Sequence, residues 1–444
     1  MTTVGSPHLD HDGGSVPAVI IGGGVVGCSI ALALARAGRP PLVLDRGPAA
    51  GAGSTSASSA VVRFSYSTID AVRLSWESKL LWDMWPEHLG TPDELGYARL
   101  IRTGLLILDA PASRLSMVQS HFDVVGVPYE ALTAAEIAQR CPDVDLGCFG
   151  PPKRIDDPSF WDDAVGEPLG GYLTPDAGYV DDPALAAHNL MVAAAALGAE
   201  FRFRNEVTGV LRSDRGVTGV ALADGTSIDT DVVVNAAGPY SAVVNRMASL
   251  PDTGIRTRAL RQEVHVLPQP QGYEARNGGL AVSDSDMGTY MRPHLAGTFM
   301  VGGLEPECDP LEWIDDPDAF NEHPTADGWE AQTTRAARRL TSLGVPPAPS
   351  GLAALYDVSD DWMPIYDRSD LPGFYLAIGT SGNQFKNAPM IGSVMAAIID
   401  ACESGRDHDT DPVVLDGPIT GQPIDLGQFS RRRAVHQTTN SVLG

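Results

Sequence analysis

Three glycines near the start of the chain have the spacing of a phosphate-binding turn. Gly22, Gly24 and Gly27 follow a short β-branched segment and open a predicted helix. In such a turn the first glycine permits a tight bend, the second lets backbone approach a pyrophosphate, and the third lets helix and strand pack closely. Asp45, 23 residues after Gly22, ends the next predicted strand, where a carboxylate can accept from ribose hydroxyls. A glycine turn with no ligand is the alternative, but strand, helix and acid in register favour a dinucleotide site.

Small and hydroxyl-bearing residues follow Asp45 and recur in the middle of the chain. The segment 53–63, GSTSASSAVVR, can lie along a pyrophosphate and a flavin, although a flexible Ser/Gly linker is the alternative. The predicted strand 230–238 ends in small residues that could pass under a dinucleotide, which favours FAD over NAD. The predicted cofactor contacts in these regions are Val26, Arg46, Gly53, Ser54, Thr55, Ser56, Val207, Ala237 and Gly238.

A third motif, GTSGNQFK at 379–386, opens the last predicted helix. The positive end of a helix beside a flavin would stabilise the negative charge that forms on reduction. Lys386 could add a full charge there, although a surface lysine is the alternative; the chain has only two other lysines, Lys79 and Lys153. The predicted flavin contacts in this motif are Gly379, Gly382, Gln384, Phe385 and Lys386.

Composition excludes several classes of protein. The net charge of -25 disfavours nucleic acid and anionic lipid as partners. Apolar runs are too short for a membrane span, and the polar N-terminus lacks the pattern of a secretory signal. Five scattered cysteines without a C-x-x-C pair, and ten histidines without ligand spacing, predict free thiols and no metal site. We therefore expect a cytoplasmic protein.

The elements that must position these motifs alternate along the chain. The 444 residues suffice for two domains, and residues 17–46 read as strand, turn, helix and strand. Further strands are predicted at 100–109, 201–211, 217–222, 227–235, 258–268, 280–283, 288–293, 298–303 and 374–378. Helices are predicted at 68–89, 113–125, 133–140, 182–197, 330–343 and 388–401, with an irregular excursion over 141–182.

The whole series resembles the D-amino acid oxidase superfamily, in particular its sarcosine and glycine oxidase branch. The segments that carry the resemblance are IIGGGVVGCSIALALARAG with Asp45, STSASSAVVRFSY, GYVDDPALAAHNL to VVVNAAGPYS, TYMRPHLAGTFMVGG and GTSGNQFKNAPMIG. It implies an α/β fold: a Rossmann-like FAD-binding domain of the GR2 type, interleaved with an α+β substrate domain on a mainly antiparallel sheet. We expect the FAD-binding domain at 16–92, 168–252 and 353–425, the substrate domain at 93–167 and 253–352, and flexible tails at 1–15 and 426–444.

The resemblance also implies roles for individual residues. Arg63 with Tyr66 matches an R-x-x-Y arginine, and Lys386 stands where sarcosine oxidases have a G-H-G-F-K lysine. In that family these two cations hold the substrate carboxylate. Tyr356 matches the tyrosine of a C-M-Y-T segment, and Asn383 replaces the G-H-G histidine. Arg63, Lys386, Tyr356 and Asn383 are thus the predicted catalytic residues, while His265, Arg292 and His294 could line the pocket or be structural.

Departures from the family refine the expected chemistry. The cysteine that tethers flavin in sarcosine oxidases is Ala354, and the histidine of dimethylglycine oxidases is Ala57, so FAD should be bound without a covalent link. Neither Lys79 nor Lys153 aligns with the lysine that activates oxygen, so rapid use of O₂ stays open.

The sequence therefore predicts oxidation of the C–N bond of a small amine with a carboxylate, such as glycine, sarcosine or an N-substituted glycine. Hydride would pass to flavin N5, the imine would hydrolyse, and O₂ is the expected acceptor. The alternatives are a dehydrogenase with another acceptor, a flavin-binding subunit that needs a partner, an NAD(P)-dependent enzyme, and an aromatic hydroxylase. The protein would be a monomer or a small homo-oligomer.

Overall fold

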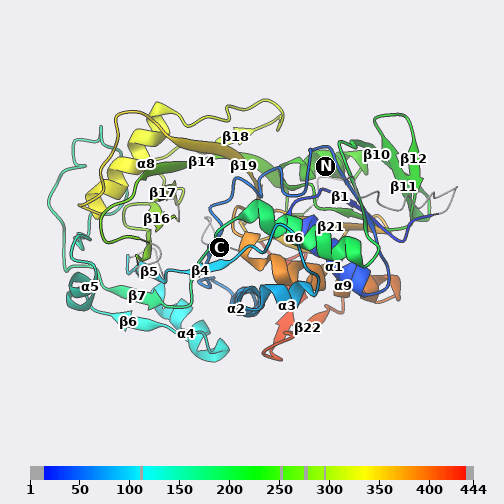
Figure 1. Ribbon diagram of the computed structural model, residues 1–444, viewed down its shortest axis with the longest axis horizontal. Helices are drawn as coiled ribbons and strands as arrows, with labels where there is room; N and C mark the ends of the chain where they lie inside the picture. Colours follow the sequence, from blue (N-terminus) through cyan, green and yellow to red (C-terminus); the bar gives the residue numbers. More distant parts are fainter. Residues whose placement is uncertain (1–14, 111–113, 251–253, 275–278, 295–296, 437–444) are drawn as a thin grey trace.

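The computed structural model describes residues 15–110, 114–250, 254–274, 279–294 and 297–436. The predicted flexible residues 1–14 and 437–444 lie outside the described residues. Two large sheets dominate the described part of the chain, a parallel one on the right of Figure 1 and a mainly antiparallel one on the left. Each of them is covered by its own helices.

The first sheet has six strands in the order β20-β21-β13-β1-β2-β9. Its strands pair in parallel, apart from the antiparallel pair β20–β21. Segments far apart in sequence build it: β1 (Val19–Ile21), β2 (Leu42–Asp45), β9 (Glu200–Phe203), β13 (Val233–Asn235), β20 (Ile365–Arg368) and β21 (Phe374–Ile378). This is the predicted Rossmann-like arrangement, and the α/β fold class is confirmed.

Continuous apolar runs in the strands let this sheet bury both faces. Ile20 and Val43 pack on one face against α1 (Val25–Arg36), α6 (Pro183–Ala196) and α9 (Ala388–Glu403). Val19 and Leu44 pack on the other face with a three-stranded antiparallel sheet and α7 (Ser241–Met247). That small sheet comprises β10 (Val207–Ser213), β11 (Gly216–Leu222) and β12 (Ser227–Asp229).

The second large sheet has nine strands and runs β18-β14-β17-β16-β15-β5-β7-β6, with β19 paired to β14. Its strands pair antiparallel, apart from the parallel pair β15–β5. The helix α8 (Ala326–Arg339) covers one face through Trp329 and Ala336. The strands are β5 (Leu105–Leu108), β6 (Glu130–Leu132), β7 (Gly171–Thr174), β14 (Thr257–Pro268), β15 (Ala281–Asp284), β16 (Thr289–Pro293), β17 (Thr298–Gly303), β18 (Glu312–Ile314) and β19 (Gly351–Ser359).

Shorter elements connect the two halves. A three-stranded sheet joins β3 (Val61–Val62), β8 (Gly178–Val180) and β4 (Leu100–Arg102). Four helices lie between β3 and β8 in the sequence: α2 (Ile69–Asp83), α3 (Trp85–Leu89), α4 (Leu115–Val125) and α5 (Ala134–Arg140). The remaining elements are the hairpin β22 (Val414–Asp416) with β23 (Pro423–Asp425) and the 3-10 turns η1 (Gly238–Tyr240), η3 (Phe385–Asn387) and η4 (Leu426–Phe429).

Several element boundaries differ from the prediction. The expected strand 201–211 is two strands, because Arg204 takes a left-handed backbone conformation with φ of 56°. The irregular segment 141–182 contains β7 and β8. Both β7 and β19 pair in the nine-stranded sheet, although the predicted boundaries at 168 and 353 put β7 and most of β19 with the FAD-binding segments. Helix α8 starts at Ala326, where Thr325 caps it, rather than at 330.

The prediction of a flexible, solvated tail is wrong for residues 426–436. Leu426 and Phe429 are buried, and Arg431 donates to the carboxylates of Asp367 and Asp409 at 3.0 and 2.7 Å. Arg433 forms a 2.7 Å ion pair with Asp361. The basic run is thus held by a cluster of acids that comes from distant parts of the chain.

The five cysteines are free thiols in the structure, as predicted. Within the described ranges, the helices are too short or too polar to cross a bilayer.

Candidate active site

A cavity of about 900 Å³ follows the glycine turn at the edge of the six-stranded sheet. It extends from the start of α1 past Asp45 to the loop that follows β21. The predicted cofactor residues that line it are Gly22, Gly24, Val26, Asp45, Arg46, Gly53, Ser54, Thr55, Ser56, Val207, Ala237, Gly238, Gly382, Gln384 and Phe385. The glycine turn, the hydroxyl segment and the loop before the last helix therefore meet at one place.

Three further predicted cofactor residues are not among the residues that line this cavity: Lys386, Gly27 and Gly379. The two glycines lie behind the cavity wall. A Cβ at Gly27 would stand 1.9 Å from the carbonyl oxygen of Gly22, so glycine is required for α1 to start this close to β1. The amide of Gly379 donates to the buried carboxylate of Asp357 at 2.6 Å. Both residues shape the wall rather than contact what lies in it.

The chemistry of this cavity fits a dinucleotide diphosphate. The N-cap residue Gly24 has no side chain to cap α1, and the first turn of α1 contains no acid. Gly24, Val25 and Val26 line the cavity, so the positive end of α1 faces it. Thr55 Oγ1 accepts from the amide of Val25 at 3.1 Å, which brings the hydroxyl segment against that helix end. Asp45 accepts from the amides of Gly23 and Gly47, both at 2.6 Å. A carboxylate has about four acceptor positions, so Asp45 is fixed at the rim with capacity for ribose hydroxyls.

A smaller cavity of about 60 Å³ adjoins the larger one. The two share Ser58, Ser59, Tyr356, Gly382 and Phe385 in their walls. All four predicted catalytic residues, Arg63, Tyr356, Asn383 and Lys386, line the small cavity. A compound in it would therefore lie beside whatever occupies the inner end of the large cavity.

Lys386 is a buried lysine whose side chain is 4 % exposed. Within the described chain, its Nζ atom donates to the carbonyl of Asn383 at 2.5 Å and lies 5.2 Å from the ring centre of Tyr66, with no carboxylate in an ion pair. Burial and the charge of Arg63 hold the pKa of Lys386 well below its usual range. An anion in the cavity would favour the charged form.

Arg63 follows β3 and enters the same cavity at 6 % exposure. Its guanidinium donates to the carbonyl of Ser65 and lies 4.7 Å from the ring centre of Tyr66. Burial lowers the pKa of Arg63, against the opposing effects of Tyr66, Tyr172 and Glu305. An arginine stays charged under such a shift, so the small cavity holds at least one permanent positive charge.

Tyr356 and Asn383 meet around Gly382. A Cβ at Gly382 would stand 2.3 Å from the Tyr356 ring, so that ring lies across the loop backbone. Burial raises the pKa of Tyr356, which keeps its hydroxyl protonated. The backbone carbonyl of Asn383 accepts from Tyr66 at 2.9 Å as well as from Lys386, while the Asn383 side chain contacts Gln384 and Trp362. Asn383 thus fixes the position of Lys386.

Lys79 and the three residues that could line the pocket or be structural are not among the residues that line the two cavities. Lys79 is paired with Asp83 and Asp176 at 2.8 and 2.9 Å. Arg292 is stacked 3.9 Å from the ring centre of Tyr179 and donates to the carbonyl of Pro293. His265 lies edge-on to Trp329 beneath α8, and His294 stacks on Tyr179.

The sequence did not single out the wall that the nine-stranded sheet contributes. Leu105, Ala281, Ser283, Tyr290 and Leu304 line the small cavity from that side. Side chains alternate between the two faces of the strands β5, β15 and β16. This alternation predicts which residues share a face, but it does not predict what that face contacts.

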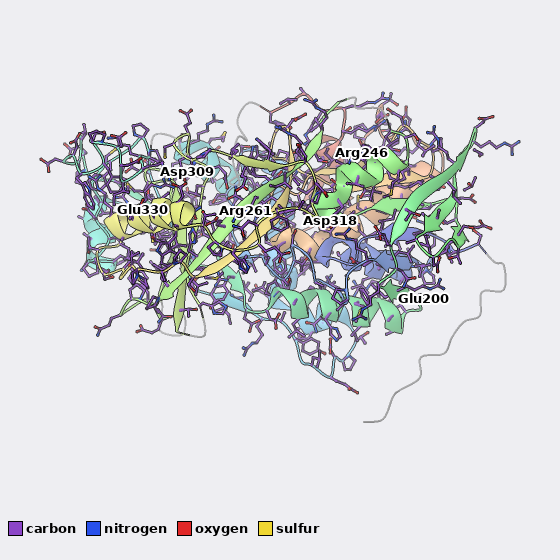
Figure 2. All side chains as sticks on the ribbon, turned by 90° about the horizontal axis from the view of Figure 1, so that it is seen from above. Glu200, Arg246, Arg261, Asp309, Asp318 and Glu330 are labelled. Atoms are coloured by element: carbon purple, nitrogen blue, oxygen red, sulfur yellow. The ribbon has the colours of Figure 1, made fainter. Side chains whose placement is uncertain are left out.

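A loop of the second half was also missed at the outer end of the large cavity. Asp318 follows β18 and pairs with Arg46, which donates to it at 3.1 Å and to the Tyr240 hydroxyl at 2.6 Å. Tyr240 in turn donates to the carbonyl of Pro317 at 3.0 Å. In Figure 2, Asp318 lies between Arg261 of the nine-stranded sheet and Arg246 of α7. We call Arg46, Tyr240 and Asp318 the outer latch.

Comparison with known proteins identifies a family to which the chain is similar. The family described as "DAO: FAD dependent oxidoreductase" matches residues 18–398. The bifunctional protein ThiO/ThiG of Nostoc sp. is 25 % identical over 86 % of this chain and 52 % of its own length. The mitochondrial pyruvate dehydrogenase phosphatase regulatory subunit of Mus musculus is 26 % identical over 66 % of this chain and 30 % of its own length. The chain thus spans about half or less of these curated relatives.

Solved structures share the fold along nearly the whole chain. The L-proline dehydrogenase of P. horikoshii superposes with a TM-score of 0.72 at 21 % identity, over 94 % of this chain and 97 % of that one. The glycine oxidase of Geobacillus kaustophilus does so with a TM-score of 0.67 at 20 % identity, over 88 % and 96 %. At these identities the likeness concerns the fold.

Proposed function

Because the chain belongs to the DAO family of FAD-dependent oxidoreductases, and its cofactor is therefore FAD, we propose that it oxidises the C–N bond of a small amine that carries a carboxylate. The substrate would be a glycine- or sarcosine-like amino acid or an N-substituted glycine. The small cavity would hold it, next to the flavin in the large cavity.

The observation that carries this proposal is the burial of Lys386 beside Arg63. Burial and repulsion from Arg63 both disfavour the charged form of Lys386, whereas the negative charge of Glu305 acts on Arg63. The burial of Lys386 is therefore unfavourable unless an anion joins it. Among the described residues Lys386 has no carboxylate partner of its own. A substrate carboxylate would supply that partner and fix one end of the substrate.

The residues of the chain then do most of the positioning. Lys386 and Arg63 bind the carboxylate, Asn383 holds Lys386 in place through its carbonyl, and Tyr356 presents a protonated hydroxyl to the shared wall. The apolar side chains of Leu105, Ala281 and Leu304 limit water in the cavity. Bound FAD supplies the two-electron acceptor that converts the amine into an imine, which water hydrolyses.

Non-covalent binding of FAD is part of the proposal. Ala57 and Ala354 line the large cavity where related enzymes have a tethering histidine or cysteine. Among the described lining residues of both cavities, none is a cysteine or a histidine. Retention of the cofactor would rest on the helix end, Asp45 and the outer latch.

A dehydrogenase is the second candidate. Lys79, one of the lysines considered for oxygen activation, is engaged by two carboxylates away from the cavities. The fold neighbour described as an L-proline dehydrogenase is consistent with another acceptor. The mouse relative is described as a regulatory subunit, which is consistent with a third candidate, a flavin-binding subunit that needs a partner.

The test is anaerobic mixing of the purified holoprotein with glycine, sarcosine, N-alkylglycines, proline and D-amino acids, followed by flavin absorbance. Bleaching by at least one of them, without any added protein, is expected. If the flavin stays oxidised with all of them, the proposed reaction is refuted. Reoxidation of the bleached protein by air or by an artificial dye then separates an oxidase from a dehydrogenase.

A further inference from the structure

The nine-stranded sheet presents a polar group to the small cavity at Ser283. In the register of β15 and β16, Ser283 lies opposite Tyr290, and β5 places Ile107 beside Ser283. Residues opposed on neighbouring strands share a face of the sheet. Ser283 and Tyr290 therefore project from one face, and both line the small cavity.

The Ser283 hydroxyl is buried and unpaired. The residue is 4 % exposed, and within the described part of the chain its Oγ atom has no hydrogen-bond partner. Of its neighbours on this face, Leu105, Ile107 and Ala281 are apolar, and the hydroxyl of Tyr290 does not bond to Ser283 but is itself without a hydrogen-bond partner among the described residues. An unpaired buried hydroxyl is unfavourable for folding, and because Ser283 lines the cavity, a ligand there can supply the missing partner.

The charges around the cavity define what kind of group can meet Ser283. The described cations in the cavity wall, Arg63 and Lys386, come from the segment after β3 and from η3. Arg292 lies on the strand next to Ser283, and its Nε is unpaired among the described residues. It is not among the residues that line the small cavity, because its guanidinium is stacked on Tyr179 and donates to the carbonyl of Pro293 at 3.0 Å. A second carboxylate at the sheet side would therefore lack a counter-charge. A neutral hydroxyl needs no counter-charge and could form a hydrogen bond with Ser283.

We propose that Ser283 determines specificity by forming a hydrogen bond with a neutral hydroxyl on the substituent of the substrate. The preferred substrate is then a small hydroxylated amino acid or N-hydroxyalkyl glycine, with its carboxylate at Arg63 and Lys386 and its hydroxyl at Ser283. This inference rests on the proposed function and names the substrate class for the same site. The cavity of about 60 Å³ restricts the substituent to a few heavy atoms.

The test compares pairs of compounds that differ only in hydroxyl against methyl. The reactive pairs are serine with α-aminobutyrate, as both enantiomers, and N-hydroxyethylglycine with N-propylglycine, each assayed by anaerobic flavin reduction. We expect the hydroxyl member to be preferred in kcat/KM by roughly 10- to 100-fold, because the methyl member leaves Ser283 unpaired. Ser283→Ala should reduce the preference to about two-fold or less.

A binding readout keeps the test independent of turnover. β-Hydroxypropionate and butyrate are isosteric carboxylates without an amine, and their dissociation constants for the holoprotein follow from the perturbed flavin spectrum. We expect the wild type to bind β-hydroxypropionate more tightly than butyrate, and Ser283→Ala to bind the two compounds equally.

Thr289 provides the matched control. Its hydroxyl is also buried and unpaired in the described chain, but it lies opposite Asp284, which faces Arg339 of α8. Thr289→Val removes a hydroxyl from the same strand pair. It should leave the kcat/KM preference and the ratio of the two dissociation constants as in the wild type.

The outcomes separate the two claims. If every amine fails to reduce the flavin, the proposed function is refuted. If butyrate binds as tightly as β-hydroxypropionate, if neither binds, or if Ser283→Ala leaves the preference intact, the role of Ser283 is overturned.

Discussion

Replacing Lys386 by methionine tests the carboxylate site directly. Methionine is close in length and apolar, so it fills the buried position without the charge. Under the proposed function, Lys386 would gain an ion pair with the substrate carboxylate in the wild type, and the substitution would remove it. Because the Lys386 side chain is 4 % exposed, this pair would be shielded from solvent.

The magnitude follows from the value of a buried charged contact. Truncating one partner of such a pair costs about 2–5 kcal/mol, and the lower end applies here because Arg63 remains. A loss of about 2–3 kcal/mol corresponds to roughly 30- to 150-fold weaker binding of carboxylate substrates. Binding of FAD should change little, since Lys386 lines the small cavity.

The pH dependence of binding gives a second signature. Burial and Arg63 lower the pKa of Lys386 in the ligand-free protein, so the lysine loses its charge at a lower pH than usual. A bound carboxylate raises that pKa, so binding takes up a proton where the free lysine is neutral. Affinity should therefore fall as pH rises through the lowered pKa, and Lys386→Met should abolish this part of the profile.

The assay is titration of the holoprotein with a carboxylate ligand over a range of pH, followed by flavin absorbance. Lys153→Met is the matched control, since Lys153 is half-buried and donates to the carbonyl of Ser159 away from the cavities. Equal affinity and an unchanged pH profile for wild type and Lys386→Met would refute the reasoning.

Three further predictions concern the cofactor and the buried acid. Asp318→Asn, which weakens the exposed ion pair with Arg46, should speed FAD release by up to roughly five-fold; stopped-flow fluorescence measures it, and high salt should erase the difference. Acid precipitation should leave all flavin in the filtrate because the attachment positions are Ala57 and Ala354; a coloured pellet would contradict this. Burial raises the pKa of Asp357 to about 7, so the folded chain binds this proton more tightly than the unfolded one, and the resulting stability is lost as pH rises from about 4 through 7. Denaturant titrations should then show Asp357→Asn gaining on wild type across that interval, by at most about 4 kcal/mol; a constant difference would sink the assignment.

Local motifs were the part of the site that could be predicted from the sequence. The turn at Gly22, Gly24 and Gly27 is a strand–turn–helix unit whose geometry depends on neighbours in the chain, and the structure has α1 starting there. Arg63 and Lys386 were found through motif resemblance, and they line one cavity although 323 residues separate them (386 − 63).

Contacts between segments that are distant in the chain could not be predicted from the sequence. Ser283 meets the cavity because β15 pairs with β5 and β16, and strand order in a large sheet does not follow from alternation in each strand. Arg46 was predicted as a cofactor contact, yet it is also bound by Asp318, which lies 272 residues away. The tail at 426–436 was predicted to be solvated, because its arginines contact their acidic partners only in the folded chain.

The most direct test of the central claim compares amines with and without a carboxylate. Proline against pyrrolidine, and sarcosine against dimethylamine, are mixed anaerobically with the holoprotein while the flavin absorbance is recorded. If buried cations hold the substrate by its acid group, the flavin should be reduced by an acid-bearing member of these pairs and stay oxidised with the partner that lacks the acid. Reduction at equal rates by both members of a pair would contradict the account.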